Sequence, residues 1–297
     1  MKEKAIKRYL ETVRGSREPK IKNLEKEKLQ EKIDRAQESL KKCNLCERKC
    51  EVDRIQKEKG YCGVKNKPVL STAFSHMGEE KFLVPSYTIF FMGCNLHCQY
   101  CQNSRISQWR TSGKEITVEE LADFIEKASN CKNVNFVGGD PTPNLPFILK
   151  ALKKSEIEVP VVWNSNFYMS EKTMDILRNT IDIYLSDWKY GNNECGEKLS
   201  EVKNYWEIIK RNHDLAKQDS ELVIRHLVLP NHFECCTKPI LEYISQNYQE
   251  DVIVNIMNQY RPSYKSREHP DINRSLKRSE AKKAWDLAEE LGLNYIK

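Results

Sequence analysis

The sequence predicts an α/β fold in which helices cover a parallel sheet. Two observations predict it: six short apolar runs alternate with amphipathic helical segments from Ser86 onward, and the runs are apolar at nearly every position. Strands of this kind are buried on both faces, as strands of a parallel sheet are. Because crossovers between parallel strands are right-handed, we expect the sheet to curl toward a barrel, with an open doubly wound sheet as the alternative.

The expected strands are short runs rich in Val, Ile, Phe or Tyr, and helical patterns lie between and after them. The strands span residues 87–92, 133–137, 159–164, 181–186, 222–229 and 252–257, and the helices span 117–129, 144–154, 170–179, 199–217, 237–248 and 279–291. Thr117 is the expected N-cap of the first of these helices, with Glu120 at capping-box spacing.

The first 80 residues are expected to form a small helical and Cys-rich metal-binding appendage, and residues 81–297 the main domain. In residues 1–42, Glu and Lys alternate around spaced apolar side chains, which predicts helix. Gly15 and Pro19 divide that helix in two. The rest of the appendage is rich in Cys and in turn-forming Gly and Pro.

Composition narrows the classes of protein that fit. The chain has 297 residues, 49 basic and 43 acidic, and a net charge of +6, a mild excess that does not demand a nucleic-acid partner. No apolar run approaches membrane-spanning length and the N-terminus is charged, so we expect a cytoplasmic protein without a membrane partner. Eleven Cys in such a protein favour metal ligation over disulfides.

Nearly every expected strand ends in residues suited to chemistry. Because ligand sites of parallel α/β folds lie at the carboxyl ends of the strands, these endings predict one ring-shaped site at one mouth of the barrel. In chain order they are Cys94–Cys101, Gly138–Asp140, Asn164–Asn166, Ser186–Lys189, Arg225–Pro230 and Asn258–Arg261.

Cys94, Cys98 and Cys101 form a C-x3-C-x2-C run directly after the first expected strand. Three thiolates at this spacing can hold a [4Fe–4S] cluster with one open iron, and an open iron can bind and activate a small molecule. The alternative is a disulfide loop or a zinc site, with His97 as a possible fourth zinc ligand.

A second set, Cys43, Cys46, Cys50 and Cys62, has the spacing C-x2-C-x3-C-x11-C and predicts a second metal site. The metal is either zinc or an auxiliary iron–sulfur cluster. A zinc ion here would be structural or bind a partner, whereas a cluster could relay electrons. A non-catalytic zinc-binding adaptor is therefore an alternative function for the chain.

The four remaining cysteines lie outside these two sets. Cys195, Cys235 and Cys236 follow strands on the side of the expected site, where they could donate a hydrogen atom, bind a further metal, or remain inert thiols. Cys131 precedes a strand, away from the mouth, and we expect it to serve in packing.

The three-Cys run resembles that of the radical SAM superfamily, including an aromatic residue, Tyr100, before the last Cys and a glycine, Gly93, before the first. Further segments resemble an uncharacterised family of it, named pyruvate formate-lyase activating enzyme-like or PflX-like by analogy. They are the N-terminal Cys set, Gly138–Leu145, Asp182–Gly191, Arg225–Pro230 and Gln259–Pro262, within roughly residues 40–295. The resemblance implies the partial (β/α)6 TIM-type barrel of radical SAM enzymes.

The resemblance also implies a reaction. In the superfamily, the open iron binds the amino and carboxylate groups of S-adenosylmethionine (SAM). One electron from the cluster cleaves SAM to methionine and a 5′-deoxyadenosyl radical, which abstracts a hydrogen atom. It implies an oxygen-sensitive enzyme of oxidoreductase or lyase type, supplied by an electron donor of the flavodoxin or ferredoxin type.

The substrate is left open between a small molecule, a protein or peptide, and RNA. Glycyl-radical activation is one alternative, although the chain lacks the short ferredoxin-type insert after the cluster that many such activases carry. An RNA substrate is considered because the N-terminus is basic.

Residue by residue, the resemblance implies which side chains contact SAM. Gly138, Gly139 and Asp140 match a Gly-Gly-Glu stretch that touches its amino group, with Asp here in place of Glu. Ser165 and Asp187 match positions near SAM, and Asn164 replaces a carboxylate that, in some members, lies beside a monovalent cation.

Two cationic side chains complete the expected site. Lys189 could pair with Asp187 or bind an acidic group of the substrate. Arg225 and His226 alternate along a strand, so they should point to opposite faces. A buried Arg needs an anionic partner, for which the SAM carboxylate or the substrate is the candidate.

Overall fold

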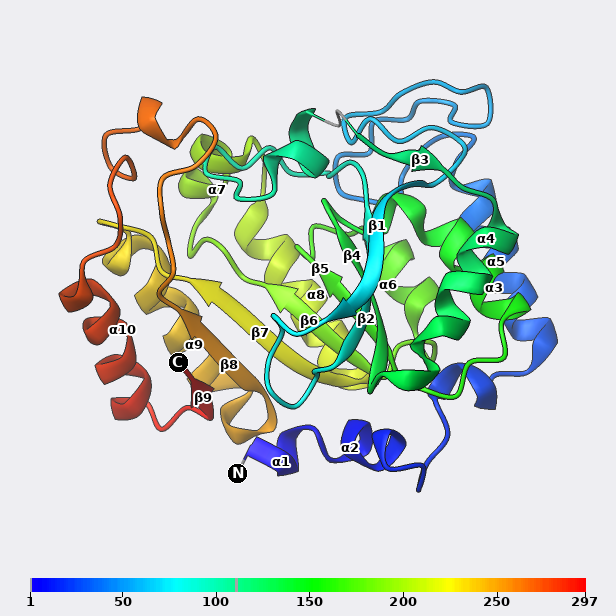
Figure 1. Ribbon diagram of the computed structural model, residues 1–297. Coiled ribbons are helices and arrows are strands. Elements are labelled where there is room, and N and C mark those ends of the chain that lie inside the picture. The colour runs from blue at the N-terminus through cyan, green and yellow to red at the C-terminus, as the bar shows by residue number, and fades with distance from the viewer. Residues whose placement is uncertain (1, 110–111) are drawn as a thin grey trace.

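The computed structural model describes residues 2–109 and 112–297. Nine strands form one sheet in the order β3-β1-β2-β4-β5-β6-β7-β8-β9 (Figure 1). They are β1 (Val69–His76), β2 (Ser86–Phe91), β3 (Lys114–Glu115), β4 (Asn133–Gly138), β5 (Val161–Ser165), β6 (Ile183–Asp187), β7 (Glu221–Leu227), β8 (Ile253–Met257) and β9 (Tyr295–Ile296). Neighbours from β2 to β9 run parallel, which confirms the expected parallel sheet.

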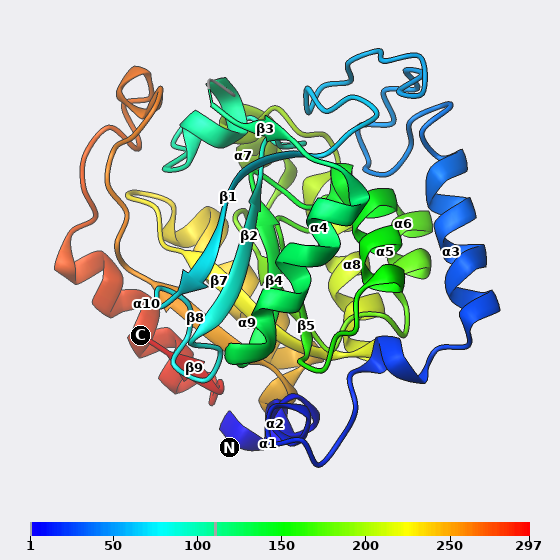
Figure 2. The same cartoon turned by 45° about the vertical axis from the view of Figure 1, so that its right-hand side comes forward.

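Helices surround this sheet. They are α1 (Lys2–Ala5), α2 (Lys7–Val13), α3 (Lys26–Glu38), α4 (Val118–Glu126), α5 (Leu145–Lys154), α6 (Glu171–Leu177), α7 (Asn193–Ser200), α8 (Tyr205–Asp219), α9 (Lys238–Asn247) and α10 (Arg278–Glu290). Most of them lie on its outer face, and α1, α2 and α7 lie at its two ends (Figures 1 and 2). The capping box of α4 is present, because Thr117 Oγ1 accepts from Glu120 N and the Glu120 carboxylate accepts from Thr117 N. None of the described helices has both the length and the apolar character that crossing a bilayer requires.

Two expectations about these elements are wrong. The single helix expected over residues 199–217 is two helices, α7 and α8, because Glu201 and Asn204 adopt left-handed backbone conformations with φ of 56° and 50°. The strand β1 was also not predicted, and it lies within the first 80 residues, which were expected to form a separate Cys-rich appendage. Since β1 is polar at many positions and pairs antiparallel with β2 and β3, it carries none of the apolar signature of the parallel strands.

The sheet curls into an open barrel, and the contacts between its two ends show this. The segment that follows β1 crosses the interior, where Glu80 accepts hydrogen bonds from Arg225 on β7 and Asn255 on β8. Residues at the end of β1 and the C-terminal residues 295–297 line one cavity. The partial barrel is therefore confirmed over the open doubly wound alternative (Figure 2).

The N-terminal helices α1 and α2 close the barrel at the amino ends of its strands (Figure 1). Ile6 and Tyr9 are buried among inward-facing strand residues such as Val162 and Val223. The backbone N–H groups of Arg8 and Tyr9 each donate to the Glu221 carboxylate at 2.7 Å. Because this end is filled by side chains, the carboxyl ends of the strands are where the barrel can admit a ligand.

Candidate active site

A cavity of about 1200 Å³ opens at the carboxyl ends of the parallel strands. Sites for small ligands commonly measure about 300–1,000 Å³, so this cavity has room for more than one molecule. It brings together all of the predicted site residues around the three-Cys run except Asp140: Cys94, Cys98, Tyr100, Cys101, Gly138, Gly139, Asn164, Ser165, Asp187, Lys189 and Arg225. The expected ring of strand endings is thus one site.

Cys94 lies on the loop that follows β2, where polar hydrogens surround its sulfur. The backbone N–H of Leu96 donates to Cys94 Sγ at 3.4 Å, and Asn166 Nδ2 donates to it at 3.5 Å. Burial raises the pKa of the Cys94 thiol, so a bare thiolate is costly here unless a metal takes the place of the proton. These donors suit a metal-bound thiolate.

Cys98 and Cys101 differ in their hydroxyl neighbours. Ser200 Oγ, at the end of α7, donates to Cys98 Sγ at 2.9 Å, and the Tyr190 hydroxyl lies 2.6 Å from the same Ser200 oxygen. Ser107 Oγ lies 3.0 Å from Cys101 Sγ and also 3.0 Å from the carbonyl oxygen of Asn103, so its one proton is shared between two acceptors when Cys101 is a thiolate. Cys98 therefore has a hydroxyl donor in Ser200, whereas Cys101 competes with a backbone carbonyl for the proton of Ser107.

Gly138 and Gly139 bring the loops after β2 and β4 into close approach. Gly138 has a φ of +134°, and a Cβ there would lie 2.1 Å from the carbonyl oxygen of Phe91. A Cβ on Gly139 would lie 2.0 Å from the carbonyl oxygen of Gly93. Only glycine fits at both positions, so backbone rather than side chains forms this wall of the cavity.

Asp140 is turned away from the cavity. It is 1% exposed, and its carboxylate accepts from the backbone N–H of Thr142 at 2.9 Å, Ser165 Oγ at 3.0 Å and the backbone N–H of Asn166 at 2.9 Å. Burial raises the pKa of this carboxyl group, and these donors oppose that shift. The geometry thus differs from the expected direct contact with SAM: Asp140 fixes the loop after β5.

Asp187, the last residue of β6, and Lys189 just after it form an ion pair, with Lys189 Nζ 2.8 Å from Asp187 Oδ2. Both side chains are largely buried and line the cavity. The pairing expected as one alternative for Lys189 is therefore present. Buried charges of opposite sign at this distance hold each other in place.

Arg225 points into the barrel, but its partner is not the expected ligand anion. Its Nε and Nη2 donate to the two carboxylate oxygens of Glu80 at 2.8 Å each, and Nη2 also donates to Glu79. His226 points to the helices instead, where its ring contacts the carbonyl of Trp188 at 2.8 Å. Arg225 and His226 thus point to opposite faces, and the anionic partners of Arg225 are Glu79 and Glu80 of this chain; its contact with SAM or a substrate stays a prediction.

Sequence reasoning missed Glu79, Glu80 and Asn255, all of which line the cavity. Asn255 Nδ2 donates to Glu80 Oε1 at 2.7 Å. Glu79 and Glu80 stand out in the sequence as two adjacent acids. Their position in the cavity could not be inferred, because β1, the strand that precedes them, was not predicted.

His97, the fourth ligand of the zinc alternative, is engaged elsewhere. Its ring stacks on Tyr61 with ring centres 4.0 Å apart, and Nδ1 lies 3.6 Å from Glu201 Oε2. It is not among the described residues that line the cavity. The three cysteines of the loop therefore form an open set of ligands, as a cluster with a free iron position requires.

The N-terminal Cys set packs against the cluster loop, which is the loop after β2 that carries Cys94, Cys98 and Cys101, and against the loop after β4. Arg54, fully buried, donates to Cys43 Sγ at 3.9 Å and to the carbonyl of Pro143 at 2.8 Å, which ties the set to the loop after β4. A Cβ on Gly60 would lie 2.7 Å from Cys50 Sγ. All eleven cysteines lie within the described residues, and none of them forms a disulfide. Within these described residues the four thiols of the set thus form no disulfide, no three of them lie within 4.8 Å of one another, and their metal-ligand role stays a prediction.

Comparison with known proteins agrees with this geometry. A model of the radical SAM superfamily matches residues 88–244. An uncharacterized protein of Methanocaldococcus jannaschii, MJ0674, is 50% identical over 272 residues, which are 89% of this chain and 79% of that protein. Pyruvate formate-lyase 1-activating enzyme of Escherichia coli K12 is 28% identical over 153 residues, 48% of this chain and 61% of that enzyme.

Among solved structures, methylornithine synthase (PylB) superposes with a TM-score of 0.50 at 18% sequence identity, over 71% of this chain and 70% of that one. This likeness concerns the fold alone. The superfamily uses a [4Fe–4S] cluster and SAM, and the described cavity has the three cysteines that such a cluster needs. The family model covers the cluster loop and the strand endings up to α9, and the chain therefore belongs to the radical SAM superfamily.

Proposed function

We propose that this chain is a radical SAM enzyme that abstracts a hydrogen atom from a substrate held in the cavity beside Cys94, Cys98 and Cys101. The observation that carries the proposal is that these three cysteines share one cavity of about 1200 Å³ with the polar endings of the other strands. When bound, a [4Fe–4S] cluster on these cysteines supplies the electron that cleaves SAM and yields the 5′-deoxyadenosyl radical.

The residues of the cavity have separate roles in this proposal. The backbone at Gly138 and Gly139 and the side chains of Asn164 and Ser165 contact the polar groups of SAM. Asp140 is a positioning residue, because its carboxylate holds the Ser165 hydroxyl and the Asn166 N–H in place. Asp140 was expected to contact SAM directly; in this proposal it acts on SAM through Ser165 and Asn166.

Asp187, Lys189, Tyr100 and Arg225 bound the part of the cavity left for substrate in this proposal. Lys189 is neutralised by Asp187, and Arg225 by Glu79 and Glu80, so these cations are already paired before a ligand enters. We infer that they shape the cavity and orient polar groups of a substrate rather than capture a free anion.

The Cys set of Cys43, Cys46, Cys50 and Cys62 is proposed to hold a second metal. Its close packing against the cluster loop supports either a structural zinc ion or an auxiliary cluster that relays electrons from an external donor. Iron and zinc analysis of the purified protein, with and without Cys46→Ser, separates the two.

Protein radical activation is a second candidate, supported by the similarity to the E. coli activating enzyme over 153 residues. Fractions of cell extract distinguish it from the others. A protein fraction, an RNA fraction and a small-molecule filtrate are each added to the reduced enzyme with SAM. The fraction that raises 5′-deoxyadenosine formation above the rate without substrate identifies the substrate class.

The proposal itself is tested without knowing the substrate. Anaerobically reconstituted protein is incubated with SAM and dithionite, and 5′-deoxyadenosine and methionine are measured by chromatography. We expect equal amounts of both products from wild type and Cys131→Ala, and none from Cys98→Ala. Product from Cys98→Ala at the wild-type rate, or no product from any form, contradicts the proposal. A zinc-binding adaptor would contain zinc alone and bind no SAM.

A further inference from the structure

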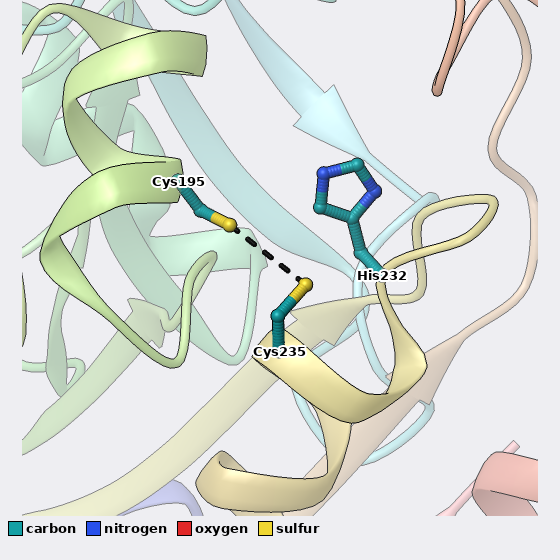
Figure 3. Close-up of side chains that lie close together, drawn as sticks. All are labelled: Cys195, His232 and Cys235. Carbon is teal, nitrogen blue, oxygen red and sulfur yellow. Dashed lines mark hydrogen bonds between the residues drawn. The ribbon is translucent and has the colours of Figure 1, made fainter.

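A third group of metal-binding side chains lies outside the cavity and outside both Cys sets. Within the described part of the chain, one group of three His, Cys, Asp or Glu ligand atoms has all its members within 4.8 Å of one another: Cys195, His232 and Cys235. Figure 3 shows the two thiols pointing at each other, with the imidazole of His232 beside them. We propose that these three residues bind a single zinc ion.

The spacing of the two thiols suits one ion rather than a cluster. Cys195 Sγ and Cys235 Sγ lie 3.8 Å apart. Two thiolates bound tetrahedrally to one zinc ion at about 2.3 Å each are separated by about 3.8 Å. A cluster binds each thiolate through a different iron atom and so holds the sulfurs further apart. A disulfide would require them to approach to about 2.05 Å.

The hydrogen bond of His232 Nδ1 leaves the other ring nitrogen, Nε2, available to bind a metal. Its Nδ1 lies 2.7 Å from the carbonyl oxygen of Pro230, which can only accept, so Nδ1 carries the proton. A neutral imidazole then has its lone pair on Nε2, and a backbone carbonyl behind the other nitrogen is the usual support of a metal-bound His. Asp271 Oδ2, 3.4 Å from Nε2, is already paired with Lys198 Nζ at 2.8 Å.

The two segments that carry the ligands are fixed against each other by contacts that do not involve the metal. Asn192 Nδ2 donates to the carbonyl of Cys235 at 2.8 Å, while its Oδ1 accepts from Cys195 N at 2.8 Å. A Cβ on Gly191 would lie 2.7 Å from the Cys235 carbonyl oxygen, so only glycine allows this approach. The thiols are therefore held at metal-binding distance before any ion arrives.

Structural zinc sites are usually closed by four ligands. Cys236 is the candidate for the fourth ligand, because it is buried and adjacent in the chain to Cys235, although its Sγ is outside the group of atoms that lie within 4.8 Å of one another. It belongs, with Cys235, to the π-helix η5 (Phe233–Thr237) that follows β7. The ligand set would then be three Cys and one His, a common combination in structural zinc sites.

The proposed ion has a structural consequence for the cluster loop. Cys195 lies in α7, and Ser200 at the other end of the same helix donates to Cys98 Sγ. The backbone of Leu199 and Ser200 also accepts hydrogen bonds from Gln99 and His97. Zinc would tie the start of α7 to η5 and so hold its end against Cys98. None of the three assigned ligands is among the described residues that line the cavity, so a direct role as hydrogen-atom donor is not favoured.

The most direct test uses the wild-type full-length protein. Crystals are grown anaerobically, and anomalous difference maps are recorded on both sides of the zinc and iron absorption edges. We expect one peak between Cys195, His232 and Cys235 that appears at the zinc edge and is absent at the iron edge. No anomalous peak there, an iron cluster there, or a Cys195–Cys235 disulfide in the map overturns the proposal.

Metal counting in solution provides the second test. We expect Cys195→Ser and His232→Gln to contain one zinc ion per chain fewer than wild type, with unchanged iron. The matched control is Cys131→Ser, a cysteine outside all three groups that contacts Ser75 Oγ, and it should keep the wild-type zinc content. Equal zinc in wild type and the folded Cys195→Ser variant overturns the proposal, with folding verified by circular dichroism and by cluster absorbance.

Discussion

The carbonyl oxygen of Cys62 lies so close to Gly93 that a Cβ atom at Gly93 would approach it to 2.5 Å. Gly93 has a φ of +89° and immediately precedes Cys94. The N-terminal Cys set and the cluster loop therefore meet backbone to backbone. This contact explains why a glycine stands before the first cysteine of the loop.

Replacing Gly93 by alanine should destabilise the protein through two effects, a strained backbone conformation and a collision with Cys62, and a control variant with the first effect alone distinguishes them. Gly93→Ala introduces a left-handed alanine, at about 1–2 kcal/mol, and a collision that adds roughly 1–3 kcal/mol. The matched control is Gly15→Ala, where φ is +71° but nothing lies within 4 Å of the new Cβ. Denaturant unfolding should show a larger loss for Gly93→Ala, together with lower iron content. Equal losses in both variants would mean that the contact with Cys62 is unimportant.

The hydroxyl of Ser200 should tune the cluster. A hydrogen bond to a ligand sulfur stabilises the more negative, reduced state of an iron–sulfur cluster. We therefore expect Ser200→Ala to lower the midpoint potential, measured by a redox titration followed by electron paramagnetic resonance. Ser107→Ala is the comparison, and its shift should be smaller because the Ser107 proton is shared between the carbonyl of Asn103 and Cys101 Sγ. A larger shift in Ser107→Ala than in Ser200→Ala would contradict the assignment.

We expect the ion pair between Arg225 and Glu80 to stabilise the fold, whether or not a ligand is bound. Its guanidinium and the Glu80 carboxylate are 15% and 1% exposed. Removing one partner of a buried pair leaves an uncompensated charge and commonly costs about 3–5 kcal/mol. We expect Glu80→Gln to destabilise the protein by an amount of this order, and Arg225→Met with Glu80→Gln to recover part of it in denaturant unfolding. Full stability of Glu80→Gln would contradict this expectation and show that Glu79, the other carboxylate on Arg225, compensates the guanidinium by itself.

His213 should make the protein sensitive to acid. Burial lowers its pKa to about 3, and its ring is held between the Ile209 carbonyl and the Ser186 hydroxyl. Because the unfolded chain takes up this proton near pH 6.5 and the folded chain does not, stability falls as the pH drops from about 6.5 toward 3. Between pH 8 and 5.5 this one group removes about 1.4 kcal/mol. Unfolding curves of His213→Gln should show a pH dependence smaller by that amount; an unchanged dependence would assign it to other groups.

The parallel strands and the position of the cavity could be predicted from the sequence. Apolar runs identify strands buried on both faces, and each of the six expected strands begins and ends within two residues of the observed bounds. Parallel strands bring their carboxyl ends together, so the strand endings alone predicted that Cys94, Ser165 and Asp187 share one cavity.

Partners far apart in the chain could not be predicted in this way. The Arg225–Glu80 pair spans 145 residues and depends on the path of the chain after β1, a strand without a clear pattern. Asp140 follows its strand as expected, yet its carboxylate turns to Ser165 because the end of β5 offers it two donors, Ser165 Oγ and Asn166 N–H, beside the Thr142 N–H of its own loop. The division between α7 and α8 falls at Glu201 and Asn204, and neither is a Gly or Pro that would mark it.

The most direct test of a SAM-binding iron on the Cys94, Cys98 and Cys101 loop is electron–nuclear double resonance of the reduced protein. SAM labelled with ¹⁷O in its carboxylate and ¹⁵N in its amino group is added before freezing. The account predicts hyperfine coupling of both labels to the cluster signal in wild type, and loss of the cluster signal itself in Cys98→Ala. A wild-type cluster signal without coupling to either label would contradict it.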